Sequence, residues 1–259
     1  MHILVVNCGS SSVKADILEK KYQKSLHQLR IERIGRNGSG KLNGENLSIP
    51  ISNEYEIALK ESLKYFLQEW KGPEISGVGH RVVHGGADYA QPVLIDDQVK
   101  EAITKMIPLV PLHNPVNLKG IEVCEQLFPD LLQIAVFDTA FHRTIPNRAQ
   151  YYAIDKKLAD EKQIRRYGFH GTSHQYVSEL TAKYLKKEMR DVKIISCHLG
   201  NGCSMTAIEY GRSVETSMGM SALEGLVMGT RPGDLDPGII SYLLSEGFNS
   251  DQISELLNE

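Results

Sequence analysis

The sequence lacks the features that mark membrane, secreted and nucleic-acid-binding proteins. No apolar run in its 259 residues approaches the roughly 18 needed to span a membrane, and its start, MHILVVNC, lacks the basic region and apolar length of a signal peptide. The four cysteines form no CxxC pair, which argues against a disulfide framework or structural zinc. Net charge is −3 without any basic run, so nothing favours a nucleic-acid partner. We therefore expect a cytoplasmic protein with reduced thiols and no membrane association.

What the chain does contain is an alternation of strand-like and helix-like patterns. Its composition, 41% hydrophobic and 24% charged, is ordinary for a globular protein of one large or two modest domains. Alternating strands and helices imply an α/β sheet with parallel pairs, whose ligands lie beyond the carboxyl ends of strands. The period-two runs predict strands at 2–8, 13–19, 25–34, 75–83 and 131–141, whereas the helical faces fall at 54–70, 96–106, 115–127 and 174–188. Residues 35–46 are rich in Gly and Asn and are predicted to form a loop.

One pattern occurs twice. Residues 192–217 repeat the order of the N-terminus: apolar strand, polar Gly-containing turn, alternating strand, third strand. When Gly9 is laid on Gly200, Ile17 meets Ile208. We therefore predict two domains, 1–150 and 151–259, with a boundary near 145–155. By this symmetry a complete second domain would run past residue 259, so we expect the second domain to be incomplete.

The turns of both copies carry groups that suit phosphate. In CGSSSVK, Gly9 permits a tight turn, Ser10, Ser11 and Ser12 add hydroxyl donors, and Lys14 adds a positive charge. This is not a Walker P-loop, because a strand and not a helix follows it. A plain Ser/Gly hairpin remains the alternative for either turn alone. A second Gly-rich turn, HLGNG at 198–202, favours a pair of phosphate sites.

Other candidate residues lie in short Gly- or Pro-containing stretches. An isolated histidine is more often structural, and Asp234 and Asp236 are best explained as turn residues. The HxxxH spacings at 80/84 and 170/174 lack the HExxH glutamate, which argues against catalytic zinc. Cations and donors with one carboxylate suit phosphoryl transfer with Mg²⁺. The candidates are Arg81 and His84 in GHRVVHGG, His113 in PLHNP, Asp138 in VFDTAFH, His170 and His174 in YGFHGTSH, and Arg231 in MGTRPGDLDPG.

Together these stretches resemble the acetate kinases of the acetokinase family. NCGSSSVK, GHRVVHGG, LHNP, VFDTAFH, YGFHGTSH, HLGNG and ETSMG…LEGL…MGTRPGDLDP occur in the family's order across essentially the whole chain. The resemblance implies a duplicated actin-like (ribonuclease H-like) α/β fold. It also implies reversible transfer of the γ-phosphoryl group of ATP to acetate with Mg²⁺, or Mn²⁺, and a homodimer.

The resemblance assigns a role to each candidate residue. Asp138, His170, Arg231 and His113 match catalytic positions, and Asn7 matches a position associated with Mg²⁺. The substrate-binding positions are Arg81, Val83, Leu112 and Phe169, of which Arg81 matches the carboxylate-binding arginine and the others line the methyl pocket. The ATP-binding positions are Lys14, Ser10, Ser12, His198, Leu199, Gly200, Asn201 and Gly202.

The sequence departs from the family at two places. A proline usual in the methyl pocket is Ala222 here, which leaves propionate open as a substrate. Family chains continue past LLNE with a DFR-type segment, a GIGEN-type adenine loop and a late Mg²⁺-binding glutamate. Two alternatives therefore stand beside an acetate kinase. One is a propionate kinase, and the other is a truncated, weak or inactive fragment that keeps phosphate binding.

Overall fold

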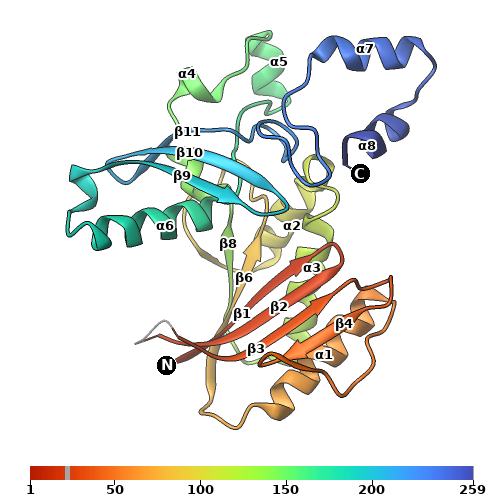
Figure 1. Ribbon diagram of the computed structural model, residues 1–259, viewed down its shortest axis with the longest axis vertical. Helices are drawn as coiled ribbons and strands as arrows, with labels where there is room; N and C mark the ends of the chain where they lie inside the picture. The colour runs from red at the N-terminus through yellow and green to blue at the C-terminus, as the bar shows by residue number, and fades with distance from the viewer. Residues whose placement is uncertain (21–23, 259) are drawn as a thin grey trace. The chain divides into compact units, whose positions relative to one another are not determined.

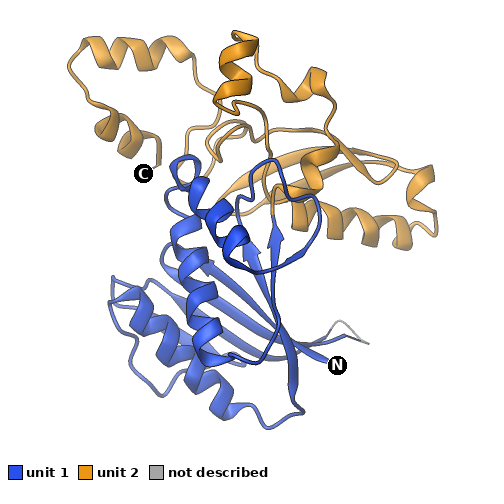
Figure 2. Cartoon of the chain, turned by 180° about the vertical axis from the view of Figure 1, so that it is seen from behind, with its two compact units in different colours: residues 1–137 blue, residues 138–259 orange. Residues whose placement is uncertain are grey.

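The computed structural model describes residues 1–20 and 24–258, and it divides into two compact units (Figure 2). Unit 1 is Met1–Phe137, and unit 2 begins at Asp138. The expected boundary near 145–155 lies later than this division. The segment after Asp138 belongs to unit 2 because it bonds to a strand there: His142 Nδ1 lies 2.8 Å from Ser213 Oγ, and Thr144 Oγ1 donates to the Ser213 carbonyl at 2.8 Å. No helix among the described residues has the length and apolar character to span a membrane.

Unit 1 is built on one mixed sheet of eight strands in the order β5-β4-β3-β2-β1-β6-β8-β7 (Figure 1). β1 pairs antiparallel with β2 and parallel with β6, which in turn pairs parallel with β8, as the alternating pattern predicted. The strands are β1 (His2–Gly9), β2 (Ser12–Glu19), β3 (Lys24–Glu32), β4 (Ser39–Leu42), β5 (Glu45–Asn46), β6 (Ile75–Val82), β7 (Val93–Leu94) and β8 (Gln133–Phe137). The predicted loop at 35–46 was wrong, because it contains the short edge strands β4 and β5.

The core of unit 1 lies between this sheet and two helices, α1 (Tyr55–Glu69) and α3 (Asn114–Leu127). The unit also contains α2 (Asp97–Lys105) and the short η1 (Ile107–Leu109). Alternate residues of β1, Leu4, Val6 and Cys8, are buried in this core together with Phe66 of α1 and Cys124 of α3. Period-two alternation sends the intervening residues of β1 to the opposite face. That opposite face is where the polar residues Asn7 and Lys14, directly opposed in the sheet, lie.

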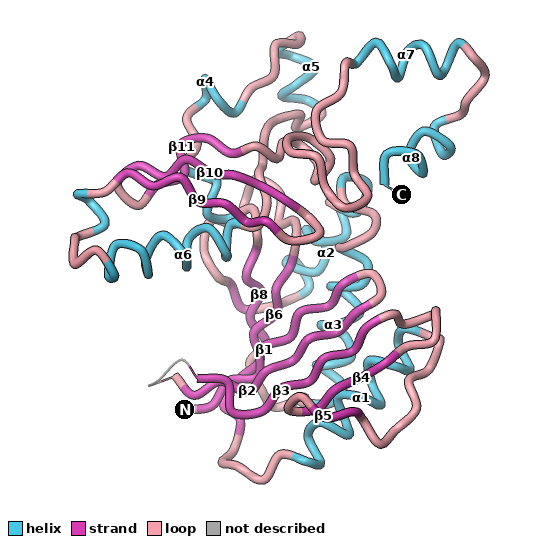
Figure 3. Tube along the Cα trace, in the orientation of Figure 1, coloured by secondary structure: helices cyan, strands magenta, loops and turns pink. Residues whose placement is uncertain are grey.

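Unit 2 contains a smaller antiparallel sheet of three strands in the order β11-β10-β9 (Figure 3). The strands are β9 (Lys193–Leu199), β10 (Cys203–Glu209) and β11 (Arg212–Thr216). The α-helices are α4 (Asn147–Gln150), α5 (Lys156–Glu161), α6 (Gly171–Tyr184), α7 (Pro237–Ser245) and α8 (Ser250–Asn258), with short 3-10 turns η2 (Ala140–Thr144) and η3 (Met189–Asp191). α8 ends the described part of this unit, since Glu259 lies outside the described residues.

The two sheets open with the same strand–turn–strand–strand unit, as the repeat predicted. The strand registers correct one predicted equivalence, that of Ile17 with Ile208. Leu4 opposes Ile17, and Ile195, the counterpart of Leu4, opposes Ala207. Ala207, and not Ile208, is therefore the counterpart of Ile17, because the second hairpin is one residue shorter than the first. Cys8 pairs with Val13, whereas its counterpart Leu199 pairs with Cys203.

The equivalent faces of the two sheets differ in their exposure to solvent. In unit 1, Leu4 and Cys8 of β1 are 0% and 4% exposed. Their counterparts on β9, Ile195 and Leu199, are 64% and 71% exposed. Among the described residues β9 pairs with β10 alone, whereas β1 is flanked on both sides. Unit 2 thus shows an uncovered apolar sheet face where unit 1 has a core.

Candidate active site

The predicted phosphate turn of unit 1 is a two-residue hairpin between β1 and β2. Gly9 ends β1, and a Cβ added to it would lie 2.7 Å from Ser12 Oγ, so the turn closes tightly around a residue without a side chain. Ser10 and Ser11 at its tip are exposed, and so is Lys14 at the start of β2. The turn therefore exposes two serine side chains at its tip, with the exposed Lys14 three residues further along the chain.

Asn7 and Arg81 form a direct contact in unit 1. Arg81 lies near the end of β6, beside β1, and its Nη1 donates to Asn7 Oδ1 at 3.1 Å. Because Asn7 opposes Lys14 across the β1–β2 ladder, these residues share the polar face of the sheet. The predicted metal-associated asparagine thus also orients the predicted substrate arginine.

The loop after β6 is fixed by two buried asparagines that sequence reasoning missed. Asn114 Oδ1 accepts from the His84 amide at 3.2 Å, and its Nδ2 donates to the His84 carbonyl at 3.0 Å. Asn117 Oδ1 accepts from the Val83 amide at 2.9 Å, and its Nδ2 donates to the Cys8 carbonyl at 2.7 Å. The first turn of α3 therefore holds the loop against the end of β1. Asn114 lies in the LHNP stretch, which was the only feature of the sequence that pointed to either asparagine.

The remaining candidates of unit 1 have contrasting environments. His113 is the N-cap residue of α3, and its amide donates to the Val110 carbonyl at 3.0 Å. Leu112 beside it is 48% exposed, whereas Val83 is 4% exposed. His84 Nδ1 accepts from the Gly86 amide at 3.0 Å, and burial lowers the pKa of His84 to about 4. His84 is therefore neutral near pH 7, and its Nδ1 is occupied by the loop.

In unit 2 the candidate carboxylate lies beside the start of α6. Asp138 is 1% exposed, its carboxylate accepts from Thr172 Oγ1 at 3.3 Å, and its carbonyl accepts from the Gly171 amide at 2.9 Å. A Cβ on Gly171 would lie 2.2 Å from the Asp138 carbonyl oxygen, so this close approach requires glycine. His170 precedes that glycine as the N-cap residue, with a left-handed backbone at φ 57°. This conformation costs a non-glycine residue about 1 kcal/mol or more.

His170, Arg231 and the HLGNG turn come together within unit 2. A Cβ on Gly202 would lie 2.7 Å from Arg231 Nη2 and 3.4 Å from His170 Nε2, so both side chains border the same point of the turn. Arg231 Nη1 donates to the Ala222 carbonyl at 2.6 Å, and burial lowers the pKa of Arg231. The imidazole of His170 stacks on that of His198, with ring centroids 4.1 Å apart. Two predicted catalytic residues thus lie at the second predicted phosphate turn.

Phe169 is 1% exposed, and its carbonyl lies 2.9 Å from His142 Nε2. Burial lowers the pKa of His142 to about 4, so the neutral ring has one nitrogen that donates and one that accepts. His142 therefore anchors the backbone next to His170. Its other contact, with Ser213, ties this segment to β11.

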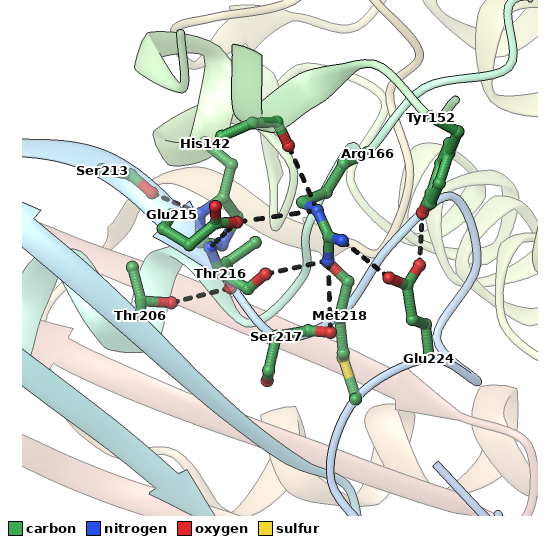
Figure 4. Close-up of polar contacts among 12 residues, drawn as sticks. His142, Tyr152, Arg166, Thr206, Ser213, Glu215, Thr216, Ser217, Met218 and Glu224 are labelled. Carbon is green, nitrogen blue, oxygen red and sulfur yellow. Dashed lines mark hydrogen bonds and ion pairs between the residues drawn. The ribbon is translucent and has the colours of Figure 1, made fainter. Parts of the chain in front are cut away.

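A cluster centred on Arg166 holds the segment that leads from β11 toward Arg231 (Figure 4). Arg166 Nη2 donates to Glu224 Oε1 at 2.7 Å, and the Tyr152 hydroxyl donates to Glu224 Oε2. The Met220 amide in turn donates to the Tyr152 hydroxyl oxygen at 2.9 Å. Arg166 also donates to the backbone carbonyls of Ala149, Thr216, Ser217 and Met218. The sequence offered only the unassigned arginine before YGFHG and the glutamate of LEGL.

Among residues 1–20 and 24–258, no group of three His, Cys, Asp or Glu side chains could hold a metal ion. Mg²⁺ commonly binds through one or two protein oxygens, with water and phosphate as its other ligands. Asn7 in unit 1 and Asp138 in unit 2 each offer such an oxygen. Each of these oxygens, taken by itself, has the chemistry of a magnesium ligand that depends on a nucleotide and water for the other ligands.

Comparison with known proteins shows close similarity over the whole chain. The Acetokinase family profile matches residues 2–259. An acetate kinase of Streptomyces avermitilis is 48% identical over 99% of this chain and 66% of its own length, and one of Clostridium acetobutylicum is 46% identical over 100% and 67%. The chain thus spans about two thirds of the length of these curated relatives.

Solved structures give the same result. The crystal structure of Porphyromonas gingivalis acetate kinase is 42% identical with a TM-score of 0.88, covering 100% of this chain and 67% of that one. A propionate kinase from Francisella tularensis is 45% identical with a TM-score of 0.93, covering 100% and 68%. The described units therefore have the fold of about two thirds of these proteins.

Proposed function

Because the chain belongs to the acetokinase family, we propose that the whole protein is an acyl-phosphate kinase. It transfers the γ-phosphoryl group of ATP reversibly to acetate, giving acetyl phosphate and ADP. The observation that carries this proposal is the convergence of Arg231 and His170 on Gly202 of a Gly-rich turn. Cations and N–H donors around one point are what a transferring phosphoryl group requires.

The reaction needs little proton transfer. A carboxylic acid with a pKa near 4.3 is already ionised at neutral pH, so its nucleophilic oxygen needs no general base. Arg81, oriented by Asn7, holds the acceptor carboxylate through charge-assisted hydrogen bonds. Arg231 and His170 donate to the equatorial oxygens, where charge spreads in the transition state. Lys14 and the two turns bind the nucleotide phosphates.

The proposal assigns Asp138 to Mg²⁺ as an oxygen donor, with nucleotide phosphates as further ligands. The family resemblance separately associates Asn7 with Mg²⁺. When bound, the ion neutralises charge on the phosphates. Asp138 acts in this assignment as a metal-binding and orienting carboxylate, held in place by Thr172 and the start of α6. It does not act as a proton acceptor.

The acyl acceptor has a second candidate. The position usually occupied by proline is Ala222, and a propionate kinase is among the most similar solved structures. Replacing proline with alanine removes ring carbons, which gives room for one more methylene group. Propionate is therefore an alternative acceptor, although a single methylene gives only about 10- to 200-fold discrimination.

The finer partner assignments belong to the same proposal. The family resemblance implies a homodimer, and the charge and hydropathy of the sequence argue against a nucleic-acid or membrane partner. The use of ATP and the four free cysteines support a cytoplasmic location.

The test is a hydroxamate assay for acyl phosphate with ATP, Mg²⁺ and either acetate or propionate. The full-length protein should form the hydroxamate from at least one acid, and Arg231→Gln should abolish most of that product. The 259-residue chain alone should turn over poorly, because Ile195 and Leu199 lie on an uncovered sheet face that favours association. If the full-length protein forms no hydroxamate from either acid, the proposed function is wrong. If the 259-residue chain is as active as the full-length protein, it is a complete catalyst.

A further inference from the structure

The imidazole of His170 is restrained in two directions. Its Nδ1 lies 2.9 Å from Ser204 Oγ, and its ring stacks on His198 at an interplanar angle of 21°. His198 is itself held, because its Nδ1 lies 2.9 Å from Ser173 Oγ. Stacking fixes the plane of the His170 ring, and the Nδ1 contact fixes its rotation within that plane. Together they set the direction in which Nε2 points.

Ser204 also contacts a second buried histidine, His174. Its Oγ also lies 2.8 Å from His174 Nε2, and His174 Nδ1 lies 3.0 Å from Ser196 Oγ. Ser204 and His174 are 0% exposed, and Ser196 is 4% exposed. The four residues form a continuous hydrogen-bonded chain, His170–Ser204–His174–Ser196, that joins β9, β10 and α6.

The number of hydrogens in this chain restricts its states. Burial, with the neighbouring His142 and His198, lowers the pKa of His174 to about 4, so at neutral pH its ring has one N–H and one lone pair. The Ser204 hydroxyl has a single hydrogen between two nitrogens. If His174 Nε2–H donates to Ser204, the Ser204 hydroxyl must donate to His170 Nδ1. A neutral His170 then carries its own hydrogen on Nε2.

The position of His170 Nε2 favours the arrangement in which the Ser204 hydroxyl donates to His170 Nδ1. Nε2 and Arg231 Nη2 border the same point at Gly202, where the phosphate turn closes. An anionic oxygen at this point is stabilised by an N–H and repelled by a nitrogen lone pair. We propose that Ser204 and His174 are positioning residues, which keep His170 Nδ1 as a hydrogen-bond acceptor so that the ring presents Nε2–H to the phosphoryl group. This inference rests on the proposed function only for the identity of the group that His170 faces.

The decisive measurement is the tautomer of His170 in the 259-residue chain, read from ¹⁵N chemical shifts after histidine labelling, with inorganic phosphate present. In the wild type, Nε2 should be the protonated nitrogen and Nδ1 the acceptor. Ser204→Ala should give a mixture of tautomers, because Nδ1 loses its hydroxyl donor. A neutral wild-type ring with its hydrogen on Nδ1 would overturn the proposal.

Kinetics of the full-length protein give an independent readout. Loss of one hydrogen bond that acts in the transition state should lower kcat about three- to tenfold while KM for ATP stays within about twofold. Ser178→Ala is the matched control, since Ser178 is also buried but its hydroxyl donates to the Gln175 carbonyl within α6. Equal effects of the two variants would reduce Ser204 to a structural role and overturn the proposal.

Two conservative variants cover the case in which Ser204→Ala does not fold. Ser204→Thr keeps the hydroxyl and should keep the Nε2–H tautomer. Ser204→Cys preserves volume but has a weak donor, so it should give mixed tautomers. Identical tautomers in the Thr and Cys variants would contradict the proposed role of the hydroxyl. Because the tautomer does not depend on the acyl acceptor, an absence of kinase activity would refute the proposed function and leave this measurement valid.

Discussion

Replacement of Arg166 by methionine should destabilise unit 2 specifically. The substitution removes the donor to Glu224 and to four backbone carbonyls, while it keeps most of the side chain's length. Removing one partner of a buried ion pair costs about 3–5 kcal/mol. Because the two side chains are 19% and 31% exposed, solvent screens part of this energy, and we expect a loss of about 2–3 kcal/mol.

The assay must report on unit 2. The only tryptophan, Trp70, lies in unit 1, so intrinsic tryptophan fluorescence would follow the wrong part of the chain. Hydrogen exchange of peptides covering residues 216–224 reads the affected segment directly. A loss of about 2–3 kcal/mol corresponds to about 30- to 150-fold faster exchange there, when exchange occurs through a rapid equilibrium of local opening and closing.

A matched control separates this effect from the loss of any ion pair. Lys156 pairs with Asp160 on α5, where the side chains are 77% and 40% exposed. Lys156→Met should therefore change hydrogen exchange at 216–224 very little, because an exposed ion pair contributes little to stability. If Arg166→Met changes exchange at 216–224 no more than Lys156→Met does, the reasoning that Arg166 anchors this segment is refuted.

Four further predictions concern activity and pH. Arg81→Ala in the full-length protein should lower kcat/KM for acetate about tenfold or more in the hydroxamate assay, and an unchanged value would exclude Arg81 as the carboxylate ligand. Gly202→Ala should lower kcat by displacing Arg231, since the new Cβ would lie 2.7 Å from Nη2; normal kcat would show that the turn can relax. Asp138→Asn should lower kcat and alter the Mg²⁺ requirement, whereas loss of a pH-dependent limb with normal Mg²⁺ dependence would identify a proton acceptor. Burial lowers the pKa of four histidines to about 4, so the stability that they contribute above pH about 6.5 is lost as pH falls toward 4. The urea midpoint of unfolding should therefore be lower at about pH 5 than at about pH 7. Equal midpoints at the two pH values would contradict this prediction. These histidines are His80, His84, His142 and His174.

The sequence predicted the elements that have strong periodicity. β1, β2, α1 and α3 were identified because alternation or a helical face recurs over many residues. The short strands β4 and β5 were missed because they lie at a sheet edge and are mostly exposed, which leaves no apolar period. The equivalence of Ile17 with Ile208 was wrong because alignment by residue number cannot detect that the second turn is one residue shorter.

Only some residues of the candidate site could be predicted from the sequence. Residues in Gly-containing motifs, such as His170 and Gly202, could be identified because glycine reveals a close approach. Arg166 could not, because four of its acceptors are backbone carbonyls, which leave no trace in the sequence. Asn117 was missed similarly, since it contacts only backbone groups of Val83 and Cys8. The roles of all these residues stay predictions until the variants are measured.

The repeated hairpin explains why a serine at position 204 can act on His170, a predicted catalytic residue. In unit 1 the residue two before Gly9 is Asn7, and Lys14 lies directly opposite it. In unit 2 the residue two before Gly200 is His198, and Ser204 lies directly opposite it. Opposed residues of an antiparallel pair project to the same face, and the shorter second turn leaves this opposition intact. Both hairpins therefore present a polar pair at the same place beside the turn. Arg81 contacts this pair in unit 1, and His170 and His174 contact it in unit 2. Because the backbone already fixes this position next to a phosphate turn, a side chain there can orient a neighbouring group without any further element of structure.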